Sequence, residues 1–169
     1  MALPKKLKFF QLSIEGIGYM HEVPELVLPT LARNMVDYQS GGMDMPIKSD
    51  MGGQAMTMEW TSAGVLPEVF GQFGAQKHDA VALRFSGAHQ ADDSDAVQAV
   101  QIVARGRHSQ IDPGTAKKGE DTPVKVTSEL SYYKLTIDGK DIIEIDPLNM
   151  VYKVNGKDLL ADHRAALGL

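Results

Sequence analysis

The side chains that could carry out catalysis or hold a metal ion are few and scattered in this sequence. The chain contains no cysteine, which excludes a thiolate nucleophile, a disulfide framework and a sulfur-ligated metal site. Its histidines occur singly, without the spacing of a metal-ligand pair, and there is no Gly-x-Ser-x-Gly nucleophile elbow. The run Asp92-Asp93-Ser94-Asp95 lacks the glycine and the terminal glutamate of an EF-hand calcium loop. We therefore expect no enzymatic activity, no bound metal and no cofactor.

Sites for phosphate groups are equally weak. Gly16-x-Gly18 and Gly71-x-x-Gly74 are too short for a dinucleotide fingerprint, which also needs a parallel βαβ setting. The run Arg105-Gly106-Arg107-His108 is a small basic patch in a chain of net charge -5, and tight binding to a phosphate backbone needs concentrated basic charge. We interpret the run as a solvated strand end or as a partner of a neighbouring carboxylate, and expect no stable nucleic-acid binding.

Length and composition indicate one soluble domain. The chain has 169 residues, 43% of them hydrophobic and 23% charged, which is typical of a single globular domain. No apolar run is long enough to cross a bilayer, and the first residues lack the apolar stretch of a secretory signal. We expect a single domain over residues 1–169, made and kept in the cytosol, with no membrane anchor.

Apolar and polar side chains alternate with the period of a half-buried strand in several segments, namely 8–15, 55–61, 81–86, 96–105, 124–137 and 141–146. Asp138-Gly139 and Asn155-Gly156 predict tight hairpin turns. Helical spacing is confined to residues 65–73 and to a short stretch near the C-terminus. The pattern predicts a mainly β, antiparallel protein, a barrel or a sandwich, with one or two short helices.

Two irregularities are expected within these strands. The extended stretch from Leu26 to Tyr38 contains Pro29, which cannot donate to a ladder and therefore favours an irregular edge. The doublet Tyr132-Tyr133 shifts the alternation of its strand, as a β-bulge does.

The segment 40–54 is unusual because it combines loop-forming and apolar residues. It has four glycines and one proline, which predict a long loop, yet it also contains Met43, Met45, Ile47 and Met51. Such side chains need to be covered. Either the loop folds onto its own core, or it is an arm that packs on a neighbouring chain, and the flexible methionine side chain suits both.

Several stretches, in this order along the chain, resemble one known family. They are Tyr38-Gln39-Ser40-Gly41-Gly42-Met43-Asp44, Thr57-Met58-Glu59-Trp60, Ile111-Asp112-Pro113-Gly114, Ser131-Tyr132-Tyr133-Lys134-Leu135-Thr136-Ile137-Asp138-Gly139-Lys140, Glu144-Ile145-Asp146, Val154-Asn155-Gly156 and Leu167-Gly168-Leu169. Together they resemble the major tail tube proteins of contractile-tailed phages, and are similar to the tube proteins of R-type pyocins. The resemblance extends from about Leu7 to Leu169.

The resemblance implies a structural subunit. Hexameric rings of such subunits stack into the hollow inner tube of a contractile tail, and the tube conducts DNA during ejection without binding it stably. The implied partners are the tail sheath, the baseplate or tail initiator, and the tape measure protein; the implied location is the virion tail, assembled in the host cytoplasm. The alternatives are the tube of a headless injection particle, such as a pyocin or a secretion-like system, and a ligand-binding β-sandwich module.

The resemblance also places a long loop and the chain termini between rings, which favours the arm interpretation of segment 40–54. We expect contacts between subunits or rings at Tyr38, Met43, Met45, Ile47 and Met51, and a docked terminus at Leu167 and Leu169. Because basic side chains in the bore would hold phosphates, we further expect acidic residues to outnumber basic ones there.

Overall fold

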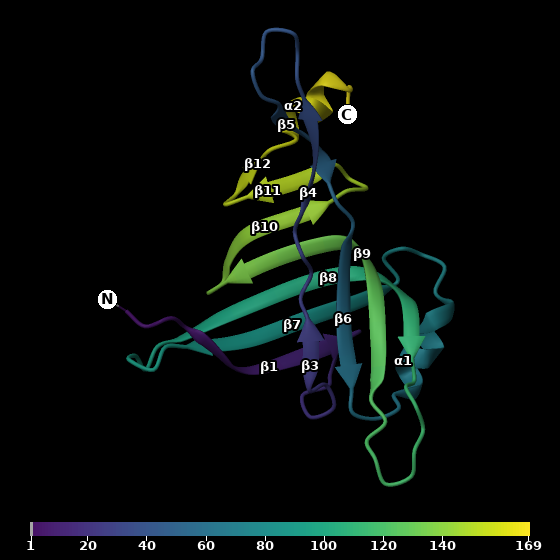
Figure 1. Cartoon of the computed structure of the whole chain (residues 1–169). Helices are drawn as coiled ribbons and strands as arrows, with labels where there is room; N and C mark the ends of the chain where they lie inside the picture. Colours follow the sequence, from purple (N-terminus) through teal and green to yellow (C-terminus); the bar gives the residue numbers. More distant parts are fainter. Residues whose placement is uncertain (1) are drawn as a thin grey trace.

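The computed structural model describes residues 2–169 and consists mainly of antiparallel strands (Figure 1). Ten strands form one sheet: β1 (Lys6–Ile14), β2 (Ile17–Gly18), β3 (Glu25–Val27), β6 (Met56–Ser62), β7 (Val81–Gln90), β8 (Val97–Asp112), β9 (Val124–Ile137), β10 (Lys140–Asp146), β11 (Val151–Val154) and β12 (Lys157–Asp158). A separate ribbon pairs β4 (Arg33–Tyr38) with β5 (Ile47–Gly53). The helices are α1 (Pro67–Gly71), followed by a 3-10 turn (Gln72–Gly74), and α2 (Ala161–Ala166). The predicted fold class is confirmed.

Strand β9 divides the molecule into two parts because it changes partner along its length. Residues Val124–Leu130 pair with β6, whereas residues Tyr133–Ile137 pair with β10, and β8 runs along the other edge throughout. In the lower part of Figure 1, β1, β3, β6, β7, β8 and β9 wrap around a common core. We call this part the barrel. In the upper part, β9, β10, β11 and β12 extend the sheet beyond the barrel, and we call this part the extension.

The change of partner coincides with a bulge. Arg105 of β8 pairs with Tyr132, but the next residue, Gly106, pairs with Leu130, so Ser131 is an extra residue in β9. A Cβ atom on Gly106 would lie 2.1 Å from the carbonyl oxygen of Glu129, so only glycine allows the two strands to approach this closely. The bulge predicted at Tyr132-Tyr133 is confirmed, one residue earlier.

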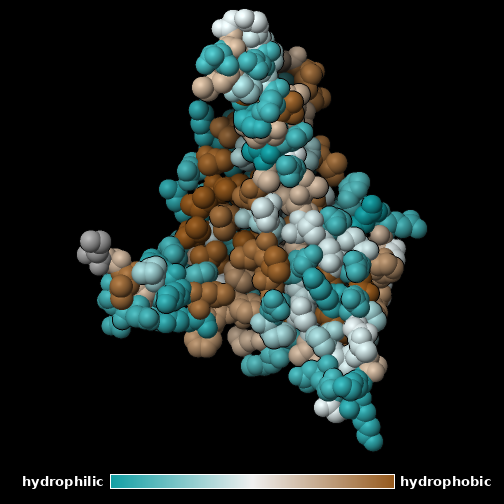
Figure 2. Space-filling view, viewed as in Figure 1, coloured by the Kyte–Doolittle hydropathy of each residue, from teal (hydrophilic) through white to brown (hydrophobic). Residues whose placement is uncertain are grey.

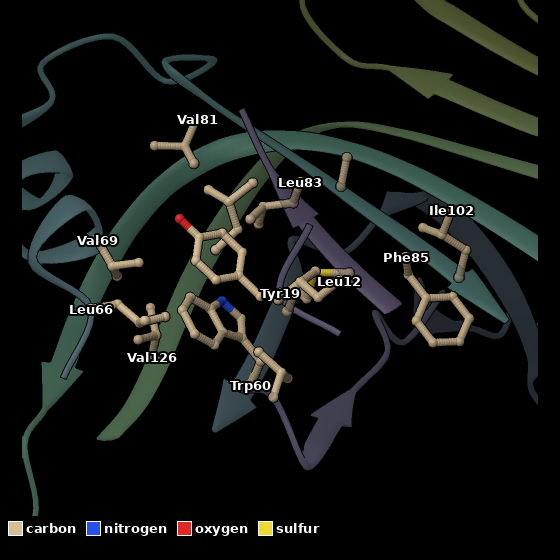
Figure 3. Close-up of a cluster of buried hydrophobic side chains, with 14 of the residues drawn as sticks. Leu12, Tyr19, Trp60, Leu66, Val69, Val81, Leu83, Phe85, Ile102 and Val126 are labelled. Carbon is tan, nitrogen blue, oxygen red and sulfur yellow. The ribbon is translucent and has the colours of Figure 1, made fainter. Parts of the chain in front are cut away.

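The barrel core is built from alternate residues of the strands. On β6, Met56, Met58 and Trp60 are buried while their neighbours are only partly covered, as the period of two predicted. In Figure 3 the Trp60 ring lies beside Tyr19, and Leu66 and Val69 from the α1 region approach the same cluster. Helix α1 therefore closes one side of the barrel.

The turns follow their sequences. Asp138 and Gly139 have φ of 49° and 77°, and Asn155 and Gly156 have φ of 50° and 80°. Both pairs adopt the left-handed conformation that a two-residue type I′ hairpin turn requires. The hairpins β9–β10 and β11–β12 are confirmed.

The prediction of a continuous loop over residues 40–54 is wrong in its second half. Residues 47–53 form strand β5, which pairs with β4, so only the tip of the segment is a loop. Gly52 and Gly53 lie at the end of strand β5, where the register with β4 shifts near Arg33. This irregularity places Gly52 at a φ of 111°, so the strand can include both glycines. The expected stretch from Leu26 to Tyr38 is likewise divided into β3 and β4, with an irregular link around Pro29.

Candidate assembly surface

The β4–β5 ribbon has two chemically different faces. Residues opposite each other in an antiparallel pair share a face, and the register places Asp37 opposite Lys48 and Met35 opposite Asp50. Lys48 forms an ion pair with Asp37 at 2.6 Å, and Arg33 forms one with Asp50 at 2.8 Å. The Arg33 guanidinium also holds the pKa of Asp50 below its usual range. This face is charged and internally neutralised.

The opposite face of the ribbon is apolar and uncovered. The register places Tyr38 opposite Ile47, with Val36 and Met51 at alternating positions on the same face. Tyr38, Ile47 and Met51 are 56%, 55% and 65% exposed. An isolated two-stranded ribbon has little stability in water, so a ribbon with one exposed apolar face indicates a surface that a second molecule covers.

Met43 and Met45 are both predicted to contact a neighbouring subunit, but they lie in different environments at the tip of the ribbon. Met43 is half-buried: its backbone N–H donates to the Ser40 carbonyl at 3.0 Å, and its Sδ accepts the Ser40 N–H at 3.4 Å. Gln39 Nε2 donates to the Met43 carbonyl at 3.1 Å. Met45, in contrast, is 67% exposed. The structure thus gathers Tyr38, Ile47 and Met51 on one face, leaves Met45 at the tip and folds Met43 into the turn.

The base of the ribbon is anchored to the extension. The Arg33 guanidinium lies 5.4 Å from the centre of the Tyr152 ring on β11. A mostly apolar pocket of about 380 Å³ opens between the two elements; its walls include Leu31, Met56, Ile145, Val151 and Leu160. The ribbon is therefore held at its base, and in Figure 1 the loop that joins its two strands is the uppermost part of the molecule.

One face of the extension continues the barrel core without being covered by it. The register aligns Leu12, Phe85, Ile102, Leu135 and Ile143 in one row across five strands. The first three are buried, but Leu135 and Ile143 are only partly buried. Figure 2 shows the result as a continuous hydrophobic area over the extension, beside the ribbon. The sequence did not reveal this surface, because alternation looks the same whether the chain or a neighbour covers the apolar side.

The other face of the extension is polar. Lys134 forms an ion pair with Asp141 at 3.1 Å, and the Tyr132 hydroxyl donates to Glu144 at 3.0 Å. Burial and this hydrogen bond raise the pKa of Tyr132 to about 12. We call this the polar face.

The basic run 105–108 does not form a common patch. The Arg105 guanidinium lies 5.9 Å from the centre of the Tyr132 ring, and Arg107 donates to the Gln76 carbonyl at 3.3 Å. His108 is buried on the opposite side of β8, where burial lowers its pKa. Neither arginine forms an ion pair with a carboxylate among residues 2–169, and both are exposed, so of the two interpretations the solvated strand end describes the arginines.

The C-terminal turn is ordered by its own hydrogen bonds. Leu167 N–H donates to the His163 carbonyl at 3.1 Å, and Leu169 N–H donates to the Arg164 carbonyl at 3.0 Å, with Gly168 at φ 75°. Leu167 and Leu169 are nevertheless 65% and 78% exposed. The terminus presents two apolar side chains outward, and their docking on a neighbour stays a prediction.

Within residues 2–169 no group of three or more His, Asp or Glu side chains is arranged to hold a metal ion. The acidic turn at residues 92–95 contacts the N-terminal segment. Asp92 forms an ion pair with Lys8 at 2.6 Å, and Asp93 accepts a hydrogen bond from the Leu3 N–H at 2.9 Å. Over the same part of the chain, no helix is long and apolar enough to span a membrane.

Comparison with known proteins agrees with this architecture. The family described as phage tail tube protein FII matches residues 4–168. The tail tube protein of Escherichia phage P2 is 40% identical over an alignment of 172 positions that covers all of both chains. The major tail tube protein of Serratia phage KSP20 is 38% identical, covering all of this chain and 99% of the relative.

Solved structures show the same fold at low sequence identity. A chain of the extended sheath–tube complex of an extracellular contractile injection system (PVC) superposes with a TM-score of 0.60 at 9% identity, covering 79% of this chain and 91% of the other. A chain of the tube-terminating cap of the anti-feeding prophage gives 0.59 at 14% identity, covering 82% and 93%. The full-length matches to phage proteins show that the chain belongs to the phage tail tube protein family.

Proposed function

We propose that this protein is the structural subunit of the inner tube of a contractile phage tail, in which hexameric rings stack into a hollow cylinder. The observation that carries the proposal is the exposed apolar surface shared by the β4–β5 ribbon and the extension. A single chain leaves this surface in water, and burying it between subunits removes that cost. The relatives from phages P2 and KSP20 are tail tube proteins, which supports the same role.

Joining sheet edges closes the ring in this proposal. Strand β2 pairs only with Ser13 and Ile14 of β1, so the rest of the β1 edge has no strand partner among residues 2–169. At the other end of the sheet, β12 is a two-residue strand. An open edge is a template for pairing with another chain, and ring closure satisfies it.

The apolar ribbon then packs on a subunit of the adjacent ring, and the polar face of the extension lines the bore. This arrangement buries the apolar side of the extension within the wall and leaves a hydrophilic surface for passing DNA. The sheath contacts the outside of the tube, the tape measure protein occupies the bore during assembly, and the initiator seeds the first ring. One of the solved neighbours is itself part of a sheath–tube complex.

Electron microscopy of the purified protein tests the proposal directly. We expect rings or hollow cylinders that lengthen with protein concentration, and a sedimentation profile dominated by species much larger than one chain. The matched control is the Met51→Asp variant, which should remain folded and stay small. Wild-type protein that remains monomeric under all assembly conditions, including with tail initiator and tape measure proteins added, contradicts the proposal.

The tube of a headless injection particle is the second candidate, because the solved neighbours are chains of contractile injection assemblies. The subunit architecture is common to both. Capsid and portal genes beside the coding sequence distinguish a phage tail from a headless particle.

A further inference from the structure

The segment between β6 and β7 closes one side of the barrel with few attachments. It comprises residues 63–80, which include α1 and the 3-10 turn, and neither of these has a side-chain cap. Leu66 and Val69 are its only buried side chains. A helix of five residues is not stable by itself, so this segment depends on its contacts with the sheet. We call residues 63–80 the α1 segment.

Among residues 2–169, three hydrogen bonds tie the α1 segment to β8 and β9. Two of them end on the backbone carbonyls of the exposed residues Gln76 and His78, where water can replace the donor. The third joins Gln72 Oε1 to His108 Nε2 at 3.1 Å, and His108 is 4% exposed. Of the three, the bond to His108 is therefore the one that water cannot replace while the segment stays in place.

His108 is surrounded by uncharged side chains. Its Nδ1 lies 2.8 Å from the Ser128 hydroxyl, and its ring meets the Trp60 ring edge-on, with 6.4 Å between the ring centres. The amide oxygen of Gln72 only accepts, so Nε2 carries the proton and Nδ1 accepts the Ser128 hydroxyl. A neutral imidazole satisfies both partners, whereas a charged imidazolium has no carboxylate beside it.

The charged groups on the elements packed around His108 face away from its ring. Glu129 of β9 accepts the Thr57 and Ser109 hydroxyls on the outer side of the sheet, and Arg107 lies opposite it on the same side. Burial raises the pKa of Tyr19, beside Trp60, so its hydroxyl stays neutral in acid. The other charged side chains are the outer pair of Glu59 and Lys125, and the exposed Glu68, Lys77, His78 and Asp79 of the α1 segment. Water is therefore the group that can stabilise a charge on His108.

Opening the α1 segment admits water at the smallest cost. Strands β6 and β9, which carry Trp60 and Ser128, are held by continuous pairing, whereas lifting the segment breaks one hydrogen bond to the ring. Local opening begins in the weakly held parts of a fold. Burial lowers the His108 pKa, so the open form binds the proton more readily than the closed form. Opening then becomes more favourable as the pH falls through 6.5, by up to about tenfold for each pH unit.

We propose that His108 and Gln72 form an acid-sensitive latch: at neutral pH they hold the α1 segment against the barrel, and in acid the segment opens while the sheet stays folded. The inference concerns the single subunit and does not rest on the proposed function. Phe70 and Phe73 are 39% and 55% exposed on this segment, so opening also withdraws an apolar surface from any neighbour that packs there.

Trp60 can report the opening, because it is the one tryptophan of the chain and is 1% exposed next to Leu66 and Val69 (Figure 3). The probe is acrylamide, an uncharged quencher, added to the non-assembled subunit, and the quenching rate is taken from fluorescence lifetimes. The rate should rise at least about threefold from about pH 7.5 to about pH 5.5, with unchanged far-UV circular dichroism. An unchanged rate, or a rise that accompanies loss of the sheet signal, overturns the proposal.

The Gln72→Glu variant should remove the response to acid. Its carboxylate would face the imidazolium, so protonation of His108 strengthens the closed form, and quenching should not rise as the pH falls. The matched control is Gln76→Glu, which adds the same charge at an exposed position of the same segment and should respond like the wild type. Equal acid responses of the two variants contradict the latch.

Hydrogen exchange of the wild type decides the matter if Gln72→Glu does not fold. The amides of Val69 and Phe70 donate to the Leu66 carbonyl within the α1 segment. After correction for the intrinsic exchange rate, they should lose protection in acid while the amides of β9 keep theirs. Equal loss in both regions would make the transition global and overturn the proposal, whatever the outcome of ring assembly.

Discussion

The barrel and the β4–β5 ribbon both carry apolar side chains on one side of their strands, but only the barrel buries them within its own chain. Strand β6 alternates buried and partly covered residues along its whole length, and its apolar side chains lie in the core of their own chain. Strand β4 is exposed at every position, although it also carries apolar residues at alternating positions. The chain itself buries the apolar side chains of the barrel, whereas it leaves those of the ribbon exposed, and in the proposed function another subunit covers them. Changes in the two regions should therefore affect different measurements.

Removing a barrel side chain should have the largest effect on the subunit. Trp60 is 1% exposed, and Trp60→Ala should lower the free energy of unfolding by about 3–5 kcal/mol because it leaves a large cavity. Chemical denaturation of the non-assembled subunit measures this loss. Trp60→Phe is the control: the Trp60 Nε1 meets no acceptor within residues 2–169, so the smaller ring gives up no hydrogen bond and should cost less. Equal losses for both variants would show that the cavity is not the cause.

Acid should weaken the barrel through one buried histidine. His108 Nε2 lies 3.1 Å from Gln72 Oε1, which only accepts, so Nε2 carries the proton and Nδ1 accepts the Ser128 hydroxyl at 2.8 Å. Trp60, the other neighbour, is also uncharged. Burial lowers the His108 pKa below 6.5, so the unfolded state binds more protons.

Stability should therefore be full above pH 6.5 and fall as the pH drops through that value, by at most about 1.4 kcal/mol per pH unit, until the lowered folded-state pKa is passed. Unfolding curves between pH 7.5 and 5, for wild type and His108→Gln, measure the difference. The same pH slope in both proteins would assign the effect to other groups.

Substitutions in the ribbon should affect assembly strongly and the stability of the subunit only slightly, the reverse of substitutions in the barrel. Ile47→Asp and Met51→Asp should change the free energy of unfolding by less than about 0.5 kcal/mol, because both side chains are already in water. They should block cylinder growth, because a charge then faces an apolar partner. Denaturation and electron microscopy of the same samples give both numbers. Cylinders of normal length would remove the ribbon from the interface, and a large loss of stability would show that the ribbon packs on its own chain.

The smallest effect should come from the charged face of the ribbon. Lys48→Ala breaks an exposed ion pair with Asp37, which contributes less than about 1 kcal/mol. Cylinders should form at nearly the wild-type rate, which light scattering follows. A block as complete as that from Met51→Asp would reverse the assignment of the two faces.

Much of the fold was predictable because its causes are local. Strand β9 covers the predicted residues 124–137, and both turns form at the predicted dipeptides, since an Asp-Gly or Asn-Gly pair adopts positive φ with little cost. Strand β5 was missed because its glycines and Asp50 favour turns, and only pairing with β4 makes them extended. Of the predicted contact residues, the structure unites Tyr38, Ile47 and Met51, and whether they touch a neighbour is still a prediction.

The sequence by itself determined the period of each strand, the places where the chain turns back, and the absence of cysteine chemistry. Only the tertiary structure decided that β9 changes partner at its bulge, which divides one sheet into a filled barrel and an uncovered extension. The physical reason is that alternation reports which side of a strand is apolar, whereas the molecule that buries that side depends on pairings between distant segments.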